Sequence, residues 1–382
     1  MRTQDVTITL DDLGHSLDEL DSSTVVDGCG SYWRTAEQIG KGGCGSVYRG
    51  YRRDTRAPVA IKLLAEEVQD CPQQRKAFCR EAKLLSQVSH ETIVGVKEFG
   101  RNSQGRLYFA MDLIDGVDLQ HRLIDESIPV LDLLEMTQSL ASAISYLHNL
   151  GIVHRDVKSE NIVVRDEGGI TLIDFGTAVK VEDEDDVIVG TPRCMAPEQL
   201  AGKCSETTDI WAIGVLLYEC IAGASPFYKS GDKLDNIFKR ISSGTVPAMP
   251  ASVPAAVQTL IYDCLQTRPQ DRPTIDEVHS RLAELQITLC SDTEWGIVRT
   301  PNFAEGSGSY TIYNDSSEDE DSKDDAKNER KEERKEEPKR QVRKKRKLGV
   351  APLPCFGEGS GARTMHIEPS DAPNLYPMTA MA

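Results

Sequence analysis

Two short polar motifs, about twenty residues apart, constrain this chain more than any other feature of its sequence. The first, His154-Arg155-Asp156, is followed by a cation at Lys158 and a side-chain amide at Asn161. The second, Asp174-Phe175-Gly176, comes directly after the mostly apolar run 170–173. The chain can therefore bring two carboxylates, an amide and an ammonium group to one site.

Phosphoryl transfer needs such a set, because the protein must orient a hydroxyl, hold Mg²⁺ through oxygen atoms and place cations against phosphate charge. Either tripeptide alone is weak evidence. Together, and in this order, they resemble the catalytic loop and the Asp-Phe-Gly motif of the eukaryotic-type serine/threonine protein kinase family. The resemblance implies that Asp156 is the catalytic base, that Lys158 neutralises charge on the moving phosphoryl group, and that Asn161 and Asp174 hold Mg²⁺.

Composition limits the alternatives. A chain of 382 residues with 39% hydrophobic residues is consistent with a folded body plus tails, and its net charge of -17 argues against bulk nucleic-acid binding. Its ten cysteines show no C-x-x-C pair and no regular spacing, so we expect neither a zinc site nor disulfides, and a reducing intracellular compartment. We expect no secretory signal and no membrane span, because residues 1–20 lack an apolar core and Glu219 interrupts the apolar stretch 210–224.

A glycine-rich segment precedes these motifs. Residues 40–47 read Gly-Lys-Gly-Gly-Cys-Gly-Ser-Val, and glycines let a backbone approach phosphates closely. Alone, this segment is equally consistent with an ordinary hairpin. The apolar run Val59-Ala60-Ile61 follows it and ends at Lys62. We therefore interpret Lys62 as the lysine that grips the α- and β-phosphates, in preference to a lysine at a strand edge.

Helical spacing of apolar residues over 73–88 predicts a helix that carries Glu81, the glutamate aligned to pair with Lys62; Glu66, Glu67 and Glu91 fall outside it. Strands are predicted at 92–99 and 106–111, with Met111 at the back of an adenine pocket and a hinge at 112–114. By resemblance, the residues that bind ATP are Ile39, Gly40, Lys41, Gly42, Gly43, Cys44, Gly45, Ser46, Val47, Ala60, Lys62, Glu81, Met111, Asp112, Ile114 and Val163.

The second half of the chain predicts a mainly helical region. Amphipathic helices are expected over 130–150 and 274–289, and Ala196-Pro197-Glu198 supplies a third signature of the family. Arg272 is expected to pair with Glu198, although alone it would be interpreted as a surface cation. The resemblance covers residues 33–286 and implies an α+β, two-lobed protein kinase fold, with an N-lobe at 33–112 and a C-lobe at 115–286.

Both ends of the chain lack core-forming patterns. Residues 1–32 are predicted to be a flexible leader, although the alternation at 6–10 is also consistent with a short strand. Residues 291–382 are predicted to be a disordered tail with an acidic, serine-containing run at 315–325 and a basic run at 339–347. The basic run has the density of a nuclear localisation signal, which predicts binding to a nuclear import receptor and a location in cytoplasm and nucleus; an anion-binding tail is the alternative.

Two rival functions remain open. A catalytically weak kinase-fold signalling scaffold would be expected to lack one of Lys62, Asp156, Asn161 or Asp174, and all four are present. A small-molecule phosphotransferase would not need Lys158 together with Gly190-Thr191-Pro192, which in the family position a protein segment.

Three finer predictions concern regulation and substrate choice. The segment between Thr177 and Thr191 contains no Ser, Thr or Tyr, so we expect activity without a phosphate there, with an acidic residue of 182–186 pairing with Arg155. Asp118 and Glu160 are expected to receive an arginine three residues before the target hydroxyl. Finally, Cys44 and Cys194 are expected to be small apolar residues rather than redox switches.

Overall fold

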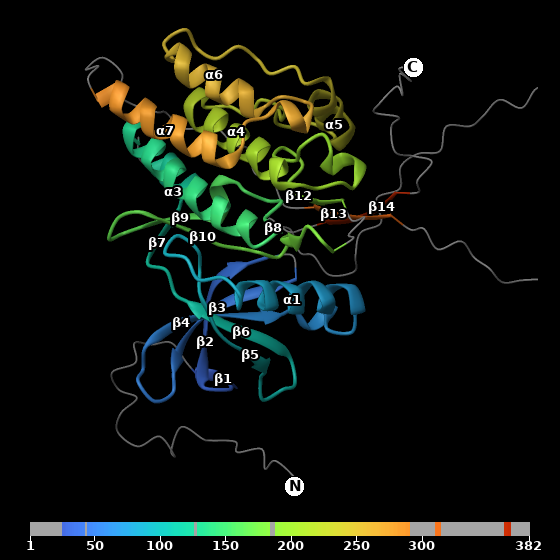
Figure 1. The fold of residues 1–382 in the computed structure, drawn as a ribbon. Helices are drawn as coiled ribbons and strands as arrows, with labels where there is room; N and C mark the ends of the chain where they lie inside the picture. The colour runs from blue at the N-terminus through green and yellow to red at the C-terminus, as the bar shows by residue number, and fades with distance from the viewer. Residues whose placement is uncertain are drawn as a thin grey trace, which may run out of the picture.

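The computed structural model describes residues 25–42, 44–125, 128–183 and 188–290, and the backbone of two further strands at 310–314 and 363–367. A sheet covered by one helix forms the smaller part, and a mainly helical region forms the larger part beside it (Figure 1). This arrangement confirms the predicted α+β, two-lobed fold.

The N-lobe is a six-stranded antiparallel sheet in the order β1-β2-β3-β4-β6-β5. The long helix of this lobe, α1 (Pro72–Leu85), lies near the predicted bounds and buries Phe78, Ala82 and Leu85, which share one helical face. A short 3-10 helix, η2 (Glu66–Val68), precedes α1. The strands are β1 (Val25–Cys29), β2 (Tyr32–Lys41), β3 (Gly45–Arg52), β4 (Pro58–Leu64), β5 (Val96–Arg101) and β6 (Leu107–Asp112).

Strand β1 corrects the prediction of a flexible leader for residues 25–29, whereas residues 1–24 lie outside the described residues. It pairs with β2 through a turn at Gly30, whose φ of 53° favours glycine. The Asp27 side chain is buried and accepts hydrogen bonds from Asn102 and Ser103 in the loop between β5 and β6. These bonds satisfy the buried carboxylate, so a segment that looks polar in sequence joins the sheet.

The C-lobe is built around α4 (Glu206–Ala222), which is buried along most of its length and starts at a capping box formed by Ser205 and Thr208. Helices α3 (Val130–Asn149) and α7 (Ile275–Cys290) pack against each other and confirm the two helices predicted here. The remaining helices are α2 (Leu119–Asp125), α5 (Leu234–Ser243), α6 (Ala255–Cys264), η3 (Ser159–Asn161), η4 (Gln199–Ala201) and η5 (Pro269–Asp271).

Short strands lie at both ends of the catalytic loop. Strand β9 (Ile162–Arg165) lies between β10 (Ile170–Leu172) and β7 (Gly116–Asp118), and β8 (Ile152–Val153) pairs with β11 (Val179–Lys180). The motif at 154–156 thus leaves one short strand, and Asn161 stands directly before another. Both ends of the catalytic loop are held by strand pairing.

Two strands in the C-terminal region differ from the predicted disorder. Strand β13 (Tyr310–Asn314) pairs antiparallel with β12 (Ile188–Gly190), and β14 (Arg363–Ile367) pairs in parallel with β13 (Figure 1). The sequence of β13 is Tyr-Thr-Ile-Tyr-Asn, rich in aromatic and β-branched residues that favour strands. The acidic run that follows it at 315–325 concealed this local preference. The charge runs themselves, at 315–325 and 339–347, lie outside the described residues.

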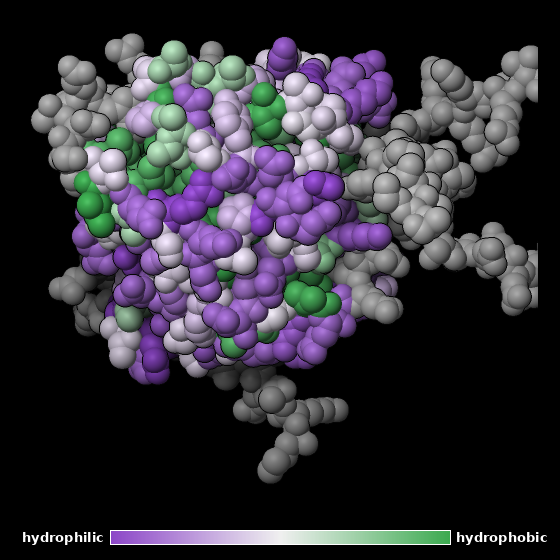
Figure 2. Space-filling model, turned by 45° about the horizontal axis from the view of Figure 1, so that its top comes forward, coloured by the Kyte–Doolittle hydropathy of each residue, from purple (hydrophilic) through white to green (hydrophobic). Residues whose placement is uncertain are grey.

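The face seen in Figure 2 is mostly hydrophilic, with apolar residues gathered in separate areas, as is ordinary for a folded protein. Across the residues that the structure describes, no helix is long and apolar enough to cross a bilayer.

A buried ion pair joins the Ala-Pro-Glu motif to the start of the last helical region. The guanidinium of Arg272 donates through both Nη atoms to Glu198, at 2.6 Å to Oε1 and 2.8 Å to Oε2. It also lies over the ring of Trp211, 5.0 Å from the centroid. The structure thus contains the pair expected from the sequence.

We predict that Glu198→Gln lowers the free energy of unfolding by about 3–5 kcal/mol, because it leaves the buried guanidinium without its counter-charge. Denaturant unfolding of the purified protein measures this loss. The control is Arg281→Gln, which removes a partly exposed pair with Asp263 and should cost no more than about 1 kcal/mol. Equal losses in the two variants would contradict the assignment.

Candidate active site

Lys62 on β4 meets Glu81, its expected partner, and also the carboxylate of Asp174. Its Nζ lies 2.5 Å from Glu81 Oε1 on α1 and 3.3 Å from Asp174 Oδ1. Burial opposes the ammonium charge, but the two carboxylates outweigh it and hold the pKa of Lys62 above its ordinary value. The lysine is therefore a fixed cation between the lobes.

The glycine-rich segment forms the β2–β3 hairpin. Gly42 N donates to Gly45 O at 2.8 Å, and a Cβ on Gly45 would lie 2.2 Å from the carbonyl oxygen of Leu63. A side chain cannot fit at Gly45, so glycine is required for β3 to lie this close to β4. Gly43 lies outside the described residues. The hairpin has the close backbone approach that a phosphate-binding loop needs.

The residues predicted to contact adenine come from both lobes. Ala60 on β4 is the register partner of Met111 on β6, and Val163 stands on β9 of the C-lobe. At the end of β6, the backbone N of Asp112 donates to Gly95 O at 2.9 Å. The other predicted nucleotide contacts follow the same elements: Ile39, Gly40 and Lys41 end β2, Cys44 precedes β3, Ser46 and Val47 lie in β3, and Ile114 follows β6.

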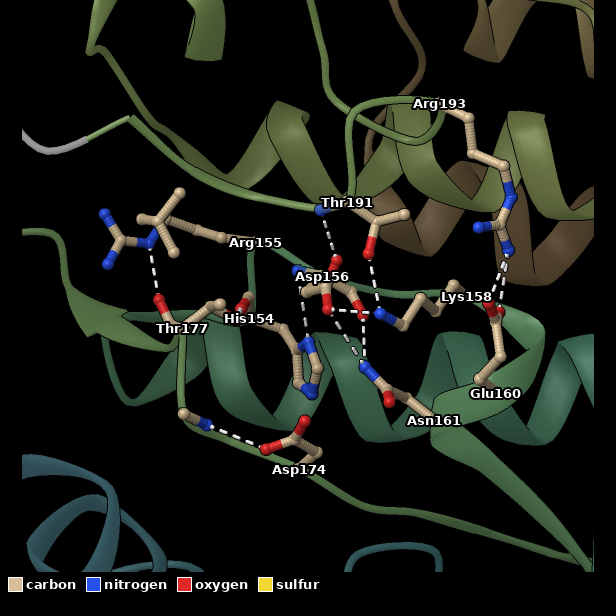
Figure 3. A network of polar contacts seen from close by, with 12 residues as sticks. His154, Arg155, Asp156, Lys158, Glu160, Asn161, Asp174, Thr177, Thr191 and Arg193 are labelled. Atoms are coloured by element: carbon tan, nitrogen blue, oxygen red, sulfur yellow. Dashed lines mark hydrogen bonds and ion pairs between the residues drawn. The ribbon is translucent and has the colours of Figure 1, made fainter. Parts of the chain in front are cut away.

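The Asp156 carboxylate is held by three neighbours in Figure 3. Its Oδ1 accepts from Thr191 N at 2.7 Å, and its Oδ2 lies 2.9 Å from Lys158 Nζ and 3.3 Å from Asn161 Nδ2. Lys158 also donates to Thr191 Oγ1 at 2.6 Å. Burial opposes the charge of Lys158, but Asp156 and Glu160 hold the pKa of this ammonium above its ordinary value. The base and the cation predicted from sequence therefore share one site.

The sequence did not predict that Thr191 would bond to both groups. It indicated only that Gly190-Thr191-Pro192 positions a protein segment in the family. The hydroxyl and the backbone N of Thr191 fix the segment 190–193 against the catalytic loop. Thr191 lies 33 residues after Lys158 in the sequence. This contact is long-range, and spacing alone gave no signal for it.

Asp209 is a second residue whose role the sequence did not indicate. It lies fully buried at the start of α4, and its carboxylate accepts from His154 N and Arg155 N, each at 2.9 Å, and from His148 Nε2 at 3.0 Å. Arg155 itself has a φ of 68°, a strained backbone conformation for a residue with a side chain. The Asp209 bonds hold this strained turn in place. Asp209 directly precedes the apolar run 210–217, and this was the only signal that the sequence offered.

Asn161 and Asp174 offer the oxygen atoms that a divalent cation needs. Asn161 Nδ2 donates to Asp156 O at 2.8 Å, which orients the amide, and the side chain of Asp174 is 42% exposed. The nearby Lys62 ammonium holds the pKa of Asp174 below its ordinary value, so the carboxylate is charged at neutral pH. Within the described ranges no group of three or more His, Cys, Asp or Glu residues could hold a metal. One carboxylate, one amide and nucleotide phosphates fit Mg²⁺, which rarely uses an all-protein cage.

The two carboxylates predicted to receive a substrate arginine already have partners. Arg193 Nη2 lies 2.8 Å from Glu160 Oε1 and 2.7 Å from Oε2. Asp118 accepts from His121 N at 2.9 Å and lies 2.6 Å from the His121 ring. The predicted arginine preference stays a prediction, and a substrate arginine at Glu160 would have to compete with Arg193.

The acidic segment is described only in part. Arg155 Nε donates to Thr177 O at 2.6 Å, and Glu182 lies 3.8 Å from Lys180. Residues 184–186 lie outside the described residues, so the pairing predicted between this segment and Arg155 remains a prediction.

Both cysteines singled out in the sequence have raised thiol pKa values. Burial, opposed by Lys62, raises the pKa of Cys44 to about 12, and its Sγ lies 2.8 Å from Gln74 Oε1. Burial also raises the pKa of the fully buried Cys194 well above its ordinary value. Thiols in this state are poor nucleophiles, which supports the interpretation of both as small packing residues.

Comparison with known proteins places the chain in a family. The protein kinase domain matches residues 33–282, and the chain therefore belongs to the protein kinase family. Among its relatives are three named serine/threonine-protein kinases: PkaA of Streptomyces coelicolor (33% identity over 271 residues), PknD of Chlamydia abortus (31% over 301) and Pkn3 of Myxococcus xanthus (31% over 273).

These alignments cover 65%, 70% and 66% of this chain respectively. They cover 49% of PkaA, 31% of PknD and 49% of Pkn3. The chain thus spans about a third of the length of PknD and about half of the lengths of PkaA and Pkn3.

Proposed function

We propose that this chain is a protein kinase that transfers the γ-phosphoryl group of ATP to serine or threonine hydroxyls of proteins. The observation that carries the proposal is the bonding of Asp156, held at once by Thr191 and Lys158 beside Asn161. The names of the relatives support the choice of serine and threonine.

Each residue has a chemical role in this proposal. Asp156 orients the substrate hydroxyl and accepts its proton, and Lys158 places a positive charge beside the group being transferred. Lys62, fixed by Glu81, binds the nucleotide phosphates. Asn161 and Asp174 would hold Mg²⁺, which when bound neutralises charge on the phosphates. Segment 190–193 would seat the substrate chain next to Asp156.

The structure gives no support to the rival role of a catalytically weak scaffold. Lys62, Asp156, Asn161 and Asp174 are all present, and Lys62 is engaged with Glu81 and Asp174. A scaffold would not require this arrangement of buried charges, which costs desolvation energy to maintain.

We predict that Asp156→Asn lowers kcat for transfer from radiolabelled ATP to a basic protein by about 10²–10⁴-fold, because the base is lost. Asp174→Ala should abolish transfer, since it removes the charged oxygen ligand for Mg²⁺. Thermal unfolding should show that both variants fold. The matched control is Asp166→Asn, an exposed carboxylate between β9 and β10 that should leave the rate unchanged. Turnover by Asp174→Ala at the parent's rate would refute the metal assignment.

We also propose that the segment between Asp174 and Thr191 needs no phosphate. The hydroxyls at its ends are already used, because Thr177 Oγ1 donates to His154 O at 2.9 Å and Thr191 Oγ1 accepts from Lys158. No other hydroxyl lies between them in the sequence. The acidic residues 182–186 supply the negative charge that a phosphate would otherwise bring.

Protein made in bacteria and treated with phosphatase should accordingly retain its full rate, measured with the same transfer assay. Mass spectrometry of the treated protein serves as the control that no phosphate remains. Activity that appears only after a second kinase has acted would disprove this proposal.

A nuclear location is a separate proposal that depends on the sequence of the basic run 339–347 alone, which lies outside the described residues. A fluorescent fusion ending at residue 335 should lose nuclear enrichment relative to the full chain, because an import receptor binds clustered Lys and Arg. Equal nuclear signal from both fusions would count against it. In that case the anion-binding alternative stands.

A further inference from the structure

Arg193 is a buried cation within segment 190–193, the segment proposed to seat the substrate. It follows Gly190-Thr191-Pro192 directly, and its side chain is only 1% exposed. An arginine this deeply buried needs acidic partners. Figure 3 shows the guanidinium turned towards Glu160, on the loop that carries Asp156 and Asn161.

The guanidinium lies between carboxylates from two different elements. Its Nη2 contacts both oxygens of Glu160, and its Nε lies 3.2 Å from Oε1 of Glu219 on α4. Glu219 is 2% exposed, and Glu160 is 26% exposed. The pair of carboxylates therefore has one deep member and one member that reaches the surface beside the catalytic loop.

Glu160 stands where a substrate could reach it. It directly precedes Asn161, and Lys158 in the same loop contacts the catalytic base. Burial opposes its charge, but Arg193 and Lys158 hold the pKa of Glu160 below its ordinary value. A charged, partly exposed carboxylate at this place would attract an arginine on the substrate if its own partner were absent.

We propose that Arg193 occupies, from within the chain, an acidic subsite made by Glu160 and Glu219, and so removes a preference for substrates with arginine before the target hydroxyl. This inference deepens and rests on the proposed kinase function. Arg193 is then a specificity-determining residue: its guanidinium places a positive charge between the two carboxylates that would otherwise attract a substrate guanidinium.

The competition strongly favours the internal arginine. Arg193 is covalently placed at the subsite and loses no translational freedom by staying there, whereas a peptide arginine does. Displacing Arg193 would also leave its own charge buried without a partner. Substrates of the parent enzyme are therefore selected by contacts other than an arginine at Glu160.

The test compares kcat/KM on peptides that carry arginine or alanine at each of the five positions before the target serine. For the parent, kcat/KM on the arginine and alanine peptides should differ by less than about threefold at every position. Arg193→Gln should prefer arginine at one position by on the order of tenfold, since a substrate guanidinium regains one charge-assisted bond. Adding Glu160→Gln to that variant should remove the gain.

Arg240→Gln is the matched control, because Arg240, on α5 and away from the catalytic loop, also pairs with a carboxylate. Its Nη2 lies 2.6 Å from Asp232 Oδ2. It should leave the arginine profile unchanged. If Arg193→Gln fails to fold in thermal unfolding, Arg193→Lys, which keeps a cation but lacks the fork, should show a smaller gain in the same direction.

Three results would overturn the inference. These are a parent that prefers arginine more than about fivefold at any position, a folded Arg193→Gln with the parent's profile, and a Glu160→Gln variant of the parent that loses an arginine preference. If the parent phosphorylates neither the peptides nor any protein, the proposed function is overturned and this inference with it. If instead Arg193→Gln transfers phosphate with the parent's arginine profile, only this inference is overturned.

Discussion

The buried carboxylate of Asp209 is the contact on which the catalytic loop depends. A charged group without access to water must receive hydrogen bonds, and Asp209 takes them from the backbone of His154 and Arg155 and from the ring of His148. Burial opposes the charge of this carboxylate, yet these bonds hold its pKa below the ordinary value. The strained turn at Arg155, and with it the position of Asp156, is thereby fixed to α4 in the core of the C-lobe.

Other buried charges join segments in the same way. Lys62 links β4 to α1 and to Asp174, which lies two residues after β10. Arg272 links the Ala-Pro-Glu motif to the region before α7. Arg193 links segment 190–193 to the catalytic loop and to α4. Removing one partner of such a pair costs more than the pair contributes in net stability, because the remaining charge stays buried. The site is therefore held by interactions that tolerate substitution poorly, whereas its surface pairs contribute little.

The sequence predicted most of the fold because local signals agreed with one another. Helical periodicity gave α1, α3 and α7, and the ordered motifs gave the two lobes and the pairs formed by Lys62 and Arg272. Strand β1 was missed because Asp27 and its neighbouring glycines look like a solvated leader until Asn102 and Ser103 are seen beside them. No local signal in the sequence indicated the contacts between residues that lie far apart along the chain.

The same limit applies to Glu160. Its alignment indicated a residue that receives arginine, and the structure shows that it does, but the arginine is Arg193 of the same chain. A motif records which chemical group a position attracts and does not record whether the chain itself supplies that group. Arg193 lies 33 residues after Glu160 in a segment interpreted only through Thr191 and the Ala-Pro-Glu motif. We therefore propose that one substitution at Arg193, in segment 190–193, can change the substrate preference of the enzyme without altering any residue that carries out the chemistry.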